Sequence, residues 1–417
     1  VRILFLSSFQ CQINFQTMII GAGAAGLFAA LRLGEAGHGK EVLLVERNER
    51  AGRKLSATGN GQGNVTNLDL SEKHYRSSDM RLVSSVLHRF VREELLQYMA
   101  SLGGIFSADE EGRVYPASRQ ASAVTDLLRF RLAELGVALR TGEKIIAAEK
   151  RGGSFYLRAA SGSEYCCKTL VLACGGAAAP HFGTDGSGYA LVRSFGHIVT
   201  PLRPSLVQQK TDLPPIRGLK GVRCNCRIRL IRGGHSVCGA EGDVIFTDYG
   251  ISGNAVFKIS PCASAGDTVA IDFLPDTEPA ALLEALRNKL KSAPALKAED
   301  LFPCVVNSAV GKAILRRCGI DGARNIQDVA GKLPELAQTA KNYTLNLTGS
   351  LGFDSAQVTQ GGVSALELDE NLMSKKVKNL YIVGELVDVD GDCGGYNLQW
   401  AFSSGWLAAG AVAGSKN

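Results

Sequence analysis

The sequence predicts an α/β fold in which one domain is built from two distant segments, with an antiparallel β-barrel-like domain and a small helical subdomain inserted between them. Three observations predict this organisation. A strand, a glycine-rich turn and a helix come near the start, short strand patterns replace them from about residue 198, and an apolar strand with a glycine-rich segment returns near the end. With 417 residues, the chain is long enough for two or three domains.

The first element is a strand, turn and helix in direct succession. Residues 15–20 end in apolar β-favouring residues and run into the turn GAGAAG, after which the spacing is helical. Gly21 permits a tight turn, Gly23 lets the backbone approach a pyrophosphate, and Gly26 lets helix and strand pack closely. The helix N-terminus offers N–H groups and a partial positive charge. The pattern predicts a Rossmann-like dinucleotide site.

The second element is a strand, residues 40–48, that contains Glu46 about 20 residues after the glycine-rich turn. A carboxylate at this place bonds the hydroxyls of an adenosine ribose, and it would repel the extra phosphate of NADP. Glu46 therefore favours FAD or NAD. The alternative for Glu46 is a solvated charge at a strand end.

The loop that follows, AGRKLSATGNGQGNVTN at residues 51–67, distinguishes between these two cofactors. Arg53 and Lys54 are expected beside the pyrophosphate, and Gly59, Gly61 and Asn64 come next. Such a loop offers backbone and amide hydrogen bonds to a long polar chain and lets a flat ring system lie close. An ordinary NAD dehydrogenase shows nothing comparable, so the loop favours FAD.

On these residues the chain resembles the BaiN-like and aminoacetone-oxidase-like flavoprotein family, which is itself similar to the glutathione-reductase-like FAD fold. The resemblance runs from about residue 15 to the end. Besides the segments above, it rests on GRVYPAS, VLACGG, FTDYGISG and the stretch GGVSALELDE to AFSSG. The family's loop more commonly contains G-x-G-R-C-N, whereas this chain has Gln62 and Gly63 before Asn64.

The resemblance implies a role for residues 379–400 near the end of the chain. A late strand, NLYIVGE, would carry Glu385 to the ribityl chain or to the pyrophosphate side. The glycine-rich segment after it would begin a helix whose N-terminus faces the flavin, with backbone N–H groups at the ring edge where negative charge develops on reduction.

Three alternating aspartates in this segment, Asp388, Asp390 and Asp392, are compatible at first sight with a calcium loop. The sixth and twelfth positions of such a loop require glycine and glutamate, but Cys393 and Gln399 stand there. We therefore predict no metal site. Asp388 either anchors the turn or reaches the substrate side, and the sequence leaves both open.

We predict non-covalent FAD binding through both ends of the chain. The resemblance places the backbone of Ile145 against the adenine, and it places the small residues that end strand 168–176 at the crossing back towards the cofactor. The expected cofactor-binding residues are Gly21, Gly23, Ala24, Ala25, Gly26, Glu46, Arg47, Arg53, Lys54, Gly59, Gly61, Asn64, Ile145, Cys174, Gly175, Gly384, Glu385, Gly395, Asn397, Leu398 and Gln399.

No catalytic residue is predicted, because the hydride chemistry belongs to the flavin. Tyr249 and Tyr396 are candidate proton donors, although aromatic packing is the commoner role for both. The histidines have no catalytic or metal-ligand spacing, so we expect surface or capping positions for them. Cys393 is expected to be dispensable for turnover.

Between the two ends, the patterns indicate the inserted parts. Residues 112–135 predict a turn and an amphipathic helix. Short strands with turn signals follow from about residue 198, and helical spacing occupies 277–335. We expect an FAD-binding domain at 14–197 and 358–417, a β domain at 198–276 and 336–357, and a helical subdomain at 277–335.

The function we expect is that of an FAD-dependent oxidoreductase, which transfers a hydride between the flavin and a small organic substrate between the FAD domain and the insertion. The chain has no second GxGxxG motif and no C-x₄-C pair, which disfavours a dedicated NAD(P)H domain and a disulfide-reductase mechanism. NAD(P)H as a transient donor stays open. The resemblance suggests reduction of an unsaturated ring substrate or oxidation of a small amine.

The alternatives are an FAD-dependent RNA-modifying enzyme and a flavin-binding protein without turnover. The net charge of +6 is diluted over the chain, so we expect no nucleic-acid partner. The interleaved arginines of residues 223–234 are more typical of a solvated strand face. The sequence does not determine the oligomeric state.

Eleven cysteines without a repeated framework suggest a reducing cytoplasm. Cys224, Cys226 and Cys238 lack a fourth ligand at zinc spacing, so packed thiols are favoured. We expect neither a membrane span nor a cleaved signal peptide. Whether residues 1–13 belong to the native protein is left open.

Overall fold

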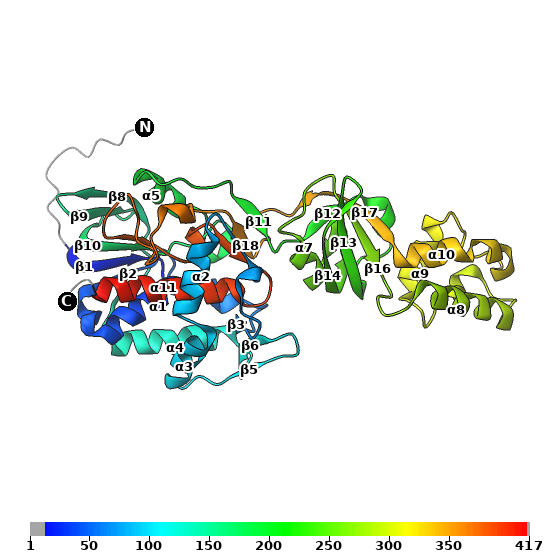
Figure 1. The fold of residues 1–417 in the computed structure, drawn as a ribbon, viewed down its shortest axis with the longest axis horizontal. Helices are drawn as coiled ribbons and strands as arrows, with labels where there is room; N and C mark the ends of the chain where they lie inside the picture. The colour runs from blue at the N-terminus through cyan, green and yellow to red at the C-terminus, as the bar shows by residue number, and fades with distance from the viewer. Residues whose placement is uncertain (1–12, 415–417) are drawn as a thin grey trace. The chain divides into compact units, whose positions relative to one another are not determined.

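The computed structural model describes residues 13–414, which form two compact units (Figure 1). The first unit comprises the chain up to Arg203 and from Val358 onwards, and the second comprises Pro204–Gln357. The expectations about residues 1–12 lie outside the described residues.

The first unit is built on a seven-stranded sheet. Its parallel part has the order β7 (Ala138–Arg140), β2 (Val42–Val45), β1 (Ile13–Ile20), β10 (Glu164–Leu172) and β19 (Leu380–Ile382). Strands β9 (Ser154–Ala159) and β8 (Ile145–Arg151) continue the sheet in antiparallel fashion from the first half of β10. Because β19 pairs with the second half of β10, the end of the chain meets the carboxyl ends of β1 and β10.

One helix packs against this sheet, and a second helix packs against the first. Helix α1 (Ala24–Leu33) follows β1, and α11 (Tyr396–Gly414) lies beside it (Figure 1). A Cβ on Gly405 would overlap the carbonyl oxygen of Ala25, so this glycine sets the close approach of the helices. The rings of Phe28 and Phe402 lie 4.3 Å apart between centroids.

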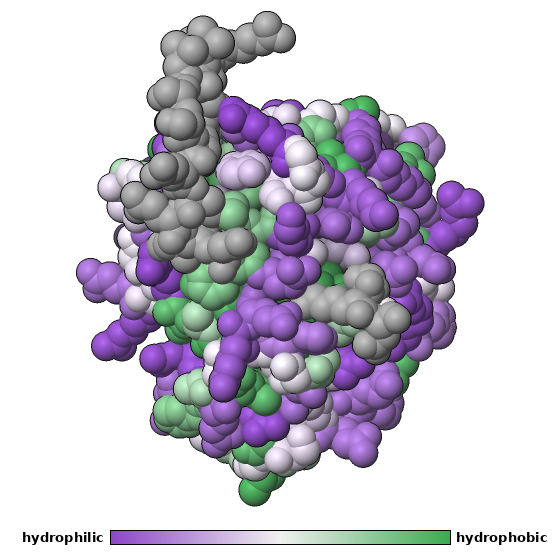
Figure 2. Space-filling view, turned by 90° about the vertical axis from the view of Figure 1, so that its left-hand side faces the viewer, coloured by the Kyte–Doolittle hydropathy of each residue, from purple (hydrophilic) through white to green (hydrophobic). Residues whose placement is uncertain are grey.

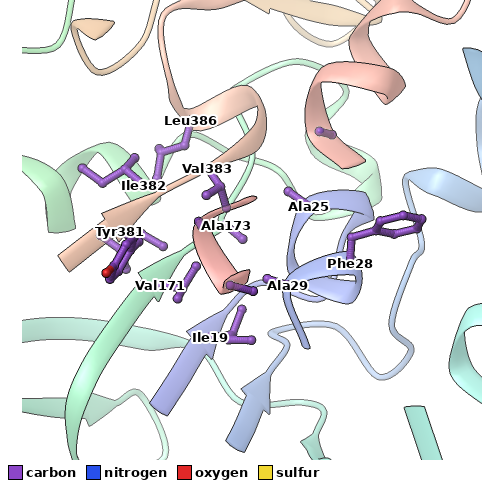
Figure 3. Packing of buried hydrophobic residues seen from close by; sticks show 14 of the residues in the cluster. Ile19, Ala25, Phe28, Ala29, Val171, Ala173, Tyr381, Ile382, Val383 and Leu386 are labelled. Carbon is purple, nitrogen blue, oxygen red and sulfur yellow. The ribbon is translucent and has the colours of Figure 1, made fainter. Parts of the chain in front are cut away.

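The core of the first unit lies between the parallel strands and α1. Figure 3 shows Ile19 of β1, Val171 of β10 and Ile382 of β19 gathered with residues of α1. All four residues of β2 are buried, as is typical of a parallel strand covered on both faces.

Smaller elements surround this framework. The predicted amphipathic helix is confirmed as α4, which buries Val124, Leu128 and Leu132. The other elements of the first unit are β3 (Thr66–Asn67), β4 (Tyr75–Ser77), α2 (Met80–Arg89), α3 (Arg92–Ser101), β5 (Phe106–Ala108), β6 (Arg113–Pro116), α4 (Ala121–Glu134), α5 (Gly188–Ser194), β18 (Val358–Gln360) and β20 (Val389–Gly391). Strand β11 (Arg203–Ser205), which begins at the last residue before the second unit, pairs with β18.

The second unit contains a closed barrel with the order β12-β15-β14-β13-β16-β17. Alternate residues of β13 face inwards, so Cys226, Ile228 and Leu230 are buried while Arg227 and Arg229 are exposed. The barrel strands are β12 (Gln209–Thr211), β13 (Arg223–Arg232), β14 (His235–Phe246), β15 (Gly250–Ser252), β16 (Thr268–Asp272) and β17 (Tyr343–Ser350). The predicted α/β fold class with an inserted barrel is confirmed.

Helices occupy the chain between β16 and β17. They are α8 (Pro279–Ser292), α9 (Ser308–Arg317) and α10 (Leu333–Lys341), and two short helices, α6 (Leu213–Ile216) and α7 (Asn254–Ile259), lie elsewhere in this unit. Buried residues of the long helices, such as Leu282 and Leu336, belong to the same hydrophobic cluster as barrel residues such as Ile228. The helices and the barrel therefore share one core.

One histidine corrects the expectation of surface or capping positions. His197 is buried, with Nδ1 2.7 Å from Glu367 Oε2 and Nε2 2.9 Å from Ser374 Oγ. Both ring nitrogens thus have partners, which allows a polar ring to be buried at little cost. Its role in the fold is structural.

Within residues 13–414, no helix is long and apolar enough to cross a membrane. Figure 2 shows a face of the molecule on which hydrophilic residues predominate, with hydrophobic residues in smaller groups between them.

Candidate cofactor and active site

The glycine-rich turn after β1 leaves an open space at the N-terminus of α1. A Cβ on Gly21 would overlap the carbonyl oxygen of Ala173, and a Cβ on Gly26 would overlap that of Gly21. A Cβ on Gly23, in contrast, would have no atom within 4 Å, and no side chain caps α1. Gly21 and Gly26 therefore serve packing. Gly23 borders a space with unpaired backbone donors, which fits a pyrophosphate.

Glu46 connects this turn to the end of β2. The side chain is 7% exposed, its Oε2 accepts the backbone N–H of Ala22 at 2.8 Å, and its Oε1 accepts the backbone and side-chain N–H groups of Asn48 at 2.9 and 2.7 Å. A solvated strand-end charge is therefore excluded. A carboxylate has about four acceptor positions, so one more hydroxyl can still bind.

We expect Glu46→Ala to weaken FAD binding by about 1–3 kcal/mol, because a buried charged hydrogen-bond acceptor is lost. Titration of the full-length apoprotein with FAD, followed by quenching of flavin fluorescence, measures this. Glu46→Gln, which keeps the size and one acceptor oxygen, should lose less. Equal affinity in the wild type and Glu46→Ala would contradict the role assigned to this residue.

The cations expected to bind the cofactor have different surroundings. Arg47 pairs with Asp185, and this guanidinium and the Ser187 hydroxyl and N–H lower the pKa of that carboxyl despite its burial. Arg53 is exposed and lies 3.5 Å from Asn48 Oδ1. Lys54 turns to a distant segment and pairs with Glu385.

The loop with Gly59 and Gly61 is an exposed turn in which both glycines have positive φ. Asn64, which follows it, is buried and donates to the carbonyl oxygens of Thr66 and Val114. The amide of Asn64 therefore anchors the loop, and the exposed glycine backbone is left for a ligand.

The two ends of the chain meet where β3 contacts the start of α11. Asn67 Nδ2 donates to the carbonyl oxygen of Gly394 at 3.0 Å, and Thr66 Oγ1 donates to Gln399 Oε1 at 2.6 Å. A Cβ on Gly395 would overlap the carbonyl oxygen of Thr66. Two segments more than 300 residues apart are thus joined without space for a side chain.

The helix start offers its backbone rather than its side chains. Asn397 folds back, accepting from the N–H of Gly391 and donating to its carbonyl oxygen. Gln399 is fully buried and donates to Ser403 Oγ at 2.9 Å, while Leu398 is partly buried. The polar side chains of Asn397 and Gln399 are therefore already held by hydrogen bonds within the protein.

The alternating aspartates bind strand β4. Arg76 Nε lies 2.8 Å from Asp390 Oδ2, and Arg76 Nη1 lies 2.8 Å from Asp392 Oδ1. Burial raises the pKa of Asp390, and Arg76 opposes that shift. Asp388 Oδ2 accepts the N–H of Ser78 at 3.2 Å, as the turn-anchoring alternative predicts. Across residues 13–414, no group of three or more His, Cys, Asp or Glu side chains could hold a metal ion.

His74 completes this network beside the start of α11. Its ring stacks on Tyr396 with centroids 4.2 Å apart, and its nitrogens face Asp392 at 3.0 Å and Asp69 at 3.1 Å. Burial raises the pKa of Tyr396, and the nearby Asp69 and Asp392 raise it further. The other candidate donor, Tyr249, lies in the second unit.

The small residues after β10 are the third segment that contributes predicted cofactor-binding residues. Cys174 Sγ approaches the carbonyl oxygen of Ile20, and burial raises the pKa of this thiol to about 12. Gly175 has φ +73°, and Thr359 Oγ1 accepts the N–H groups of Ala177 and Ala178. Ile145, at the start of β8, pairs with Ala159.

Sequence reasoning missed Thr66, His74, Arg76 and Thr359. Thr66 lies inside the quoted loop 51–67, so its position was a signal, but its partner was not visible. Thr359 lies two residues before the stretch that begins GGVSALELDE. His74 and Arg76 lie in a stretch without a motif, and only the pairing of β4 with β20 brings them to the site.

The chain is similar to known proteins over nearly its whole length. The family model described as HI0933-like protein Rossmann domain matches residues 15–411. The chain is 35% identical over 406 residues to the 3-dehydro-bile acid delta(4,6)-reductase of Clostridium scindens, covering 95% of this chain and 98% of the relative. It is 30% identical to the ribosomal RNA dihydrouridine synthase of Escherichia coli, covering 95% and 97%.

Two solved structures share the fold at low identity. The 3-ketosteroid-delta4-(5alpha)-dehydrogenase of Rhodococcus jostii has a TM-score of 0.52 at 15% identity, covering 98% of each chain. The quinol fumarate reductase of E. coli has a TM-score of 0.51 at 16% identity, covering 96% of this chain and 70% of the other.

Proposed function

We propose, since this chain belongs to the HI0933-like Rossmann-domain family, that it is a reductase that saturates a carbon–carbon double bond conjugated to a carbonyl group in a small organic substrate. NAD(P)H is the proposed electron donor. The family membership predicted from the motifs is confirmed, and the chain is an FAD-dependent oxidoreductase. The substrate class, the direction and the donor belong to the proposal.

The observation that carries the proposal is the junction of Thr66 and Asn67 with Gly394 and Gly395. It brings the N-terminal glycine loop to the start of α11, where a helix N-terminus favours negative charge. FAD, when bound, supplies hydride transfer. The residues of this chain would bind the cofactor and favour its reduced, negatively charged state.

The proposed binding roles follow from the contacts. The open space beside Gly23 would hold the pyrophosphate, and Glu46 would accept from the adenosine ribose. Glu385 would accept from the ribityl chain. The backbone N–H groups at the start of α11 would face the ring edge that becomes negative.

The named activities of two relatives support the substrate class. A delta(4,6)-reductase and a dihydrouridine synthase both add hydrogen across a carbon–carbon double bond. In a 3-keto Δ4 steroid and in uracil alike, that bond is conjugated to a carbonyl. Conjugation makes the β-carbon of the double bond electrophilic, so hydride transfer from a reduced flavin can act on both substrates.

Reduction of uridine in RNA is the second candidate, because two ribosomal RNA dihydrouridine synthases cover nearly the whole chain. The exposed arginines of β13 give it little support. Arg223 pairs with Asp243, Arg227 with Glu241, and Arg232 with Asp267, so the charges of these three are already compensated. Arg229 contacts the neutral amide of Asn342 and keeps its charge.

We also propose a cytoplasmic location. Nine of the ten cysteines in residues 13–414, including the buried Cys167 and Cys226, are free thiols, as is typical of proteins in a reducing compartment. Cys166 is the exception, since it is disulfide-bonded.

We expect the purified yellow protein to be bleached by NADH or NADPH without oxygen, and to be reoxidised by 4-androstene-3,17-dione. Anaerobic stopped-flow absorbance measures both half-reactions. Reoxidation by the steroid should exceed that of free reduced FAD by at least about tenfold. A short uridine-containing RNA in place of the steroid tests the second candidate.

Protein that is bleached by a small amine and reoxidised only by oxygen would contradict a reductase. Reoxidation by the RNA but not by the steroid would favour the second candidate. The saturated steroid, which lacks the double bond, is the matched control and should leave the flavin reduced.

A further inference from the structure

We infer that Lys54 is a positioning residue, whose ammonium group holds the Glu385 carboxylate in place and does not bind the pyrophosphate. This inference rests on the FAD placement proposed above. It changes the role that the sequence suggested for Lys54, and it assigns the pyrophosphate to other groups.

The ion pair fixes Glu385 from two sides. Lys54 Nζ lies 2.7 Å from Glu385 Oε2, and the two side chains are 22% and 20% exposed. The other oxygen, Oε1, accepts the N–H of Thr359 at 2.8 Å. Each oxygen of the carboxylate therefore has one protein donor and can accept one more hydrogen bond.

Further contacts extend this arrangement to the loop after β10. Thr359 Oγ1 accepts the N–H groups of Ala177 and Ala178 at 2.8 and 2.9 Å. A Cβ on Gly176 would overlap that hydroxyl and lie 2.8 Å from Glu385 Oε1. Both oxygens of Glu385 are thus held by protein donors, and Lys54 is its one charged partner among the described residues.

The same contacts argue against a pyrophosphate role. The charge of Lys54 is already balanced by Glu385, so the pair presents little net charge to a phosphate. Arg53 is exposed, and its contact with Asn48 is 3.5 Å long, so its guanidinium can turn to a phosphate. The uncapped N-terminus of α1 supplies the remaining donors.

Charge balance also predicts an effect on the flavin. Without Lys54, the partly buried negative charge of Glu385 would stand uncompensated on the ribityl side and would oppose the negative charge that reduction brings. Lys54 therefore makes the flavin easier to reduce, through Glu385.

The test compares two ligands on full-length apoprotein. Lys54→Met should raise the Kd for FAD at least about tenfold and leave the Kd for ADP within about twofold, because ADP has the pyrophosphate but no ribityl chain. Arg53→Met, the matched neighbour, should weaken FAD and ADP alike. Lys54→Arg should restore FAD binding, and thermal melting of each apoprotein checks the fold.

A double-mutant cycle tests that Lys54 acts through Glu385. In the Glu385→Gln background, Lys54→Met should change the Kd for FAD by less than about threefold. The flavin midpoint potential of the holoprotein should fall by about 30 mV in Lys54→Met, which is a tenfold change in the two-electron equilibrium. It should return towards the wild-type value in the double variant.

The inference would be overturned if Lys54→Met weakened ADP binding as strongly as FAD binding. It would also be overturned if the fold-losses of FAD affinity in the two single variants multiplied in the double variant. These measurements use no substrate. The variants could bind FAD and ADP as expected while the wild-type protein fails to reduce the steroid. That result would contradict the proposed function and leave the role of Lys54 intact.

Discussion

Gly395→Val is expected to give a folded protein that retains no FAD. Gly395 has φ +102°, a conformation that β-branched residues avoid, and a Cβ there would overlap the carbonyl oxygen of Thr66. The turn would have to move away from β3 and break the hydrogen bond from Asn67 to Gly394. This junction joins the two segments proposed to bind the flavin, so the loss should be nearly complete.

The ratio of flavin to protein absorbance after desalting measures the retained cofactor. Gly410→Ala, in the same helix, is the matched control, because its Cβ would meet only Arg32 Nε at an ordinary 3.7 Å. It should stay yellow. A yellow Gly395→Val protein with wild-type flavin content would show that the cofactor does not need this close approach.

Cys393→Ser tests whether the thiol of this segment is needed for flavin reduction, whereas Gly395→Val tests the backbone. We expect it to bind FAD and to keep flavin reduction within about tenfold, less than about 1.4 kcal/mol of barrier. Asp390 and Asp392 are close to Cys393 in the sequence and would oppose a thiolate, but both are paired with Arg76, which reduces their effect. A serine variant that binds FAD but loses all reduction would show a catalytic thiol.

The sequence predicts best what depends on neighbouring residues. The turn from Gly21 to Gly26 and the acid Glu46 follow from local spacing, and the structure joins them by the hydrogen bond from Ala22 to Glu46. The alternation in β13 likewise predicts an apolar inner face and an exposed row of arginines, and both are present. Period and spacing are sufficient for such features.

Contacts between distant residues could not be predicted in this way. The partners of Lys54, Thr66 and Arg76 lie more than 300 residues away, so they depend on the register of β19 and β20. For the same reason, the sequence could not show that the Gln399 amide turns inwards. The sequence shows that a polar side chain follows a glycine turn. It does not show which face of the following helix packs against the core.

The helical insertion shows a similar limit. Its periodicity predicts helices, which are present as α8, α9 and α10. Periodicity does not show which core a helix joins, and Leu282 and Leu336 pack into the same cluster as the barrel.

Arg76→Met is expected to lower the free energy of unfolding of the first unit by about 3–5 kcal/mol at pH 8, because it leaves a buried carboxylate without its cation. Asp390 is 1% exposed, and Arg76 is its charged partner among the described residues. Methionine keeps much of the apolar stem, so packing is largely preserved. Urea unfolding followed by tryptophan fluorescence measures this unit, since both tryptophans, Trp400 and Trp406, lie in α11.

The pH dependence identifies the cause. Burial raises the pKa of Asp390 in the folded protein, and removal of Arg76 takes away an interaction that lowers it, so the folded variant binds a proton more readily than the unfolded chain. The variant should therefore gain stability relative to the wild type as the pH falls from 8 to 5. Asp390→Asn added to Arg76→Met should recover most of the loss at pH 8, because a neutral amide needs no cation. A loss that is equal at both pH values, or that Asp390→Asn leaves unchanged, would show that Arg76 stabilises the turn through its packing rather than its charge.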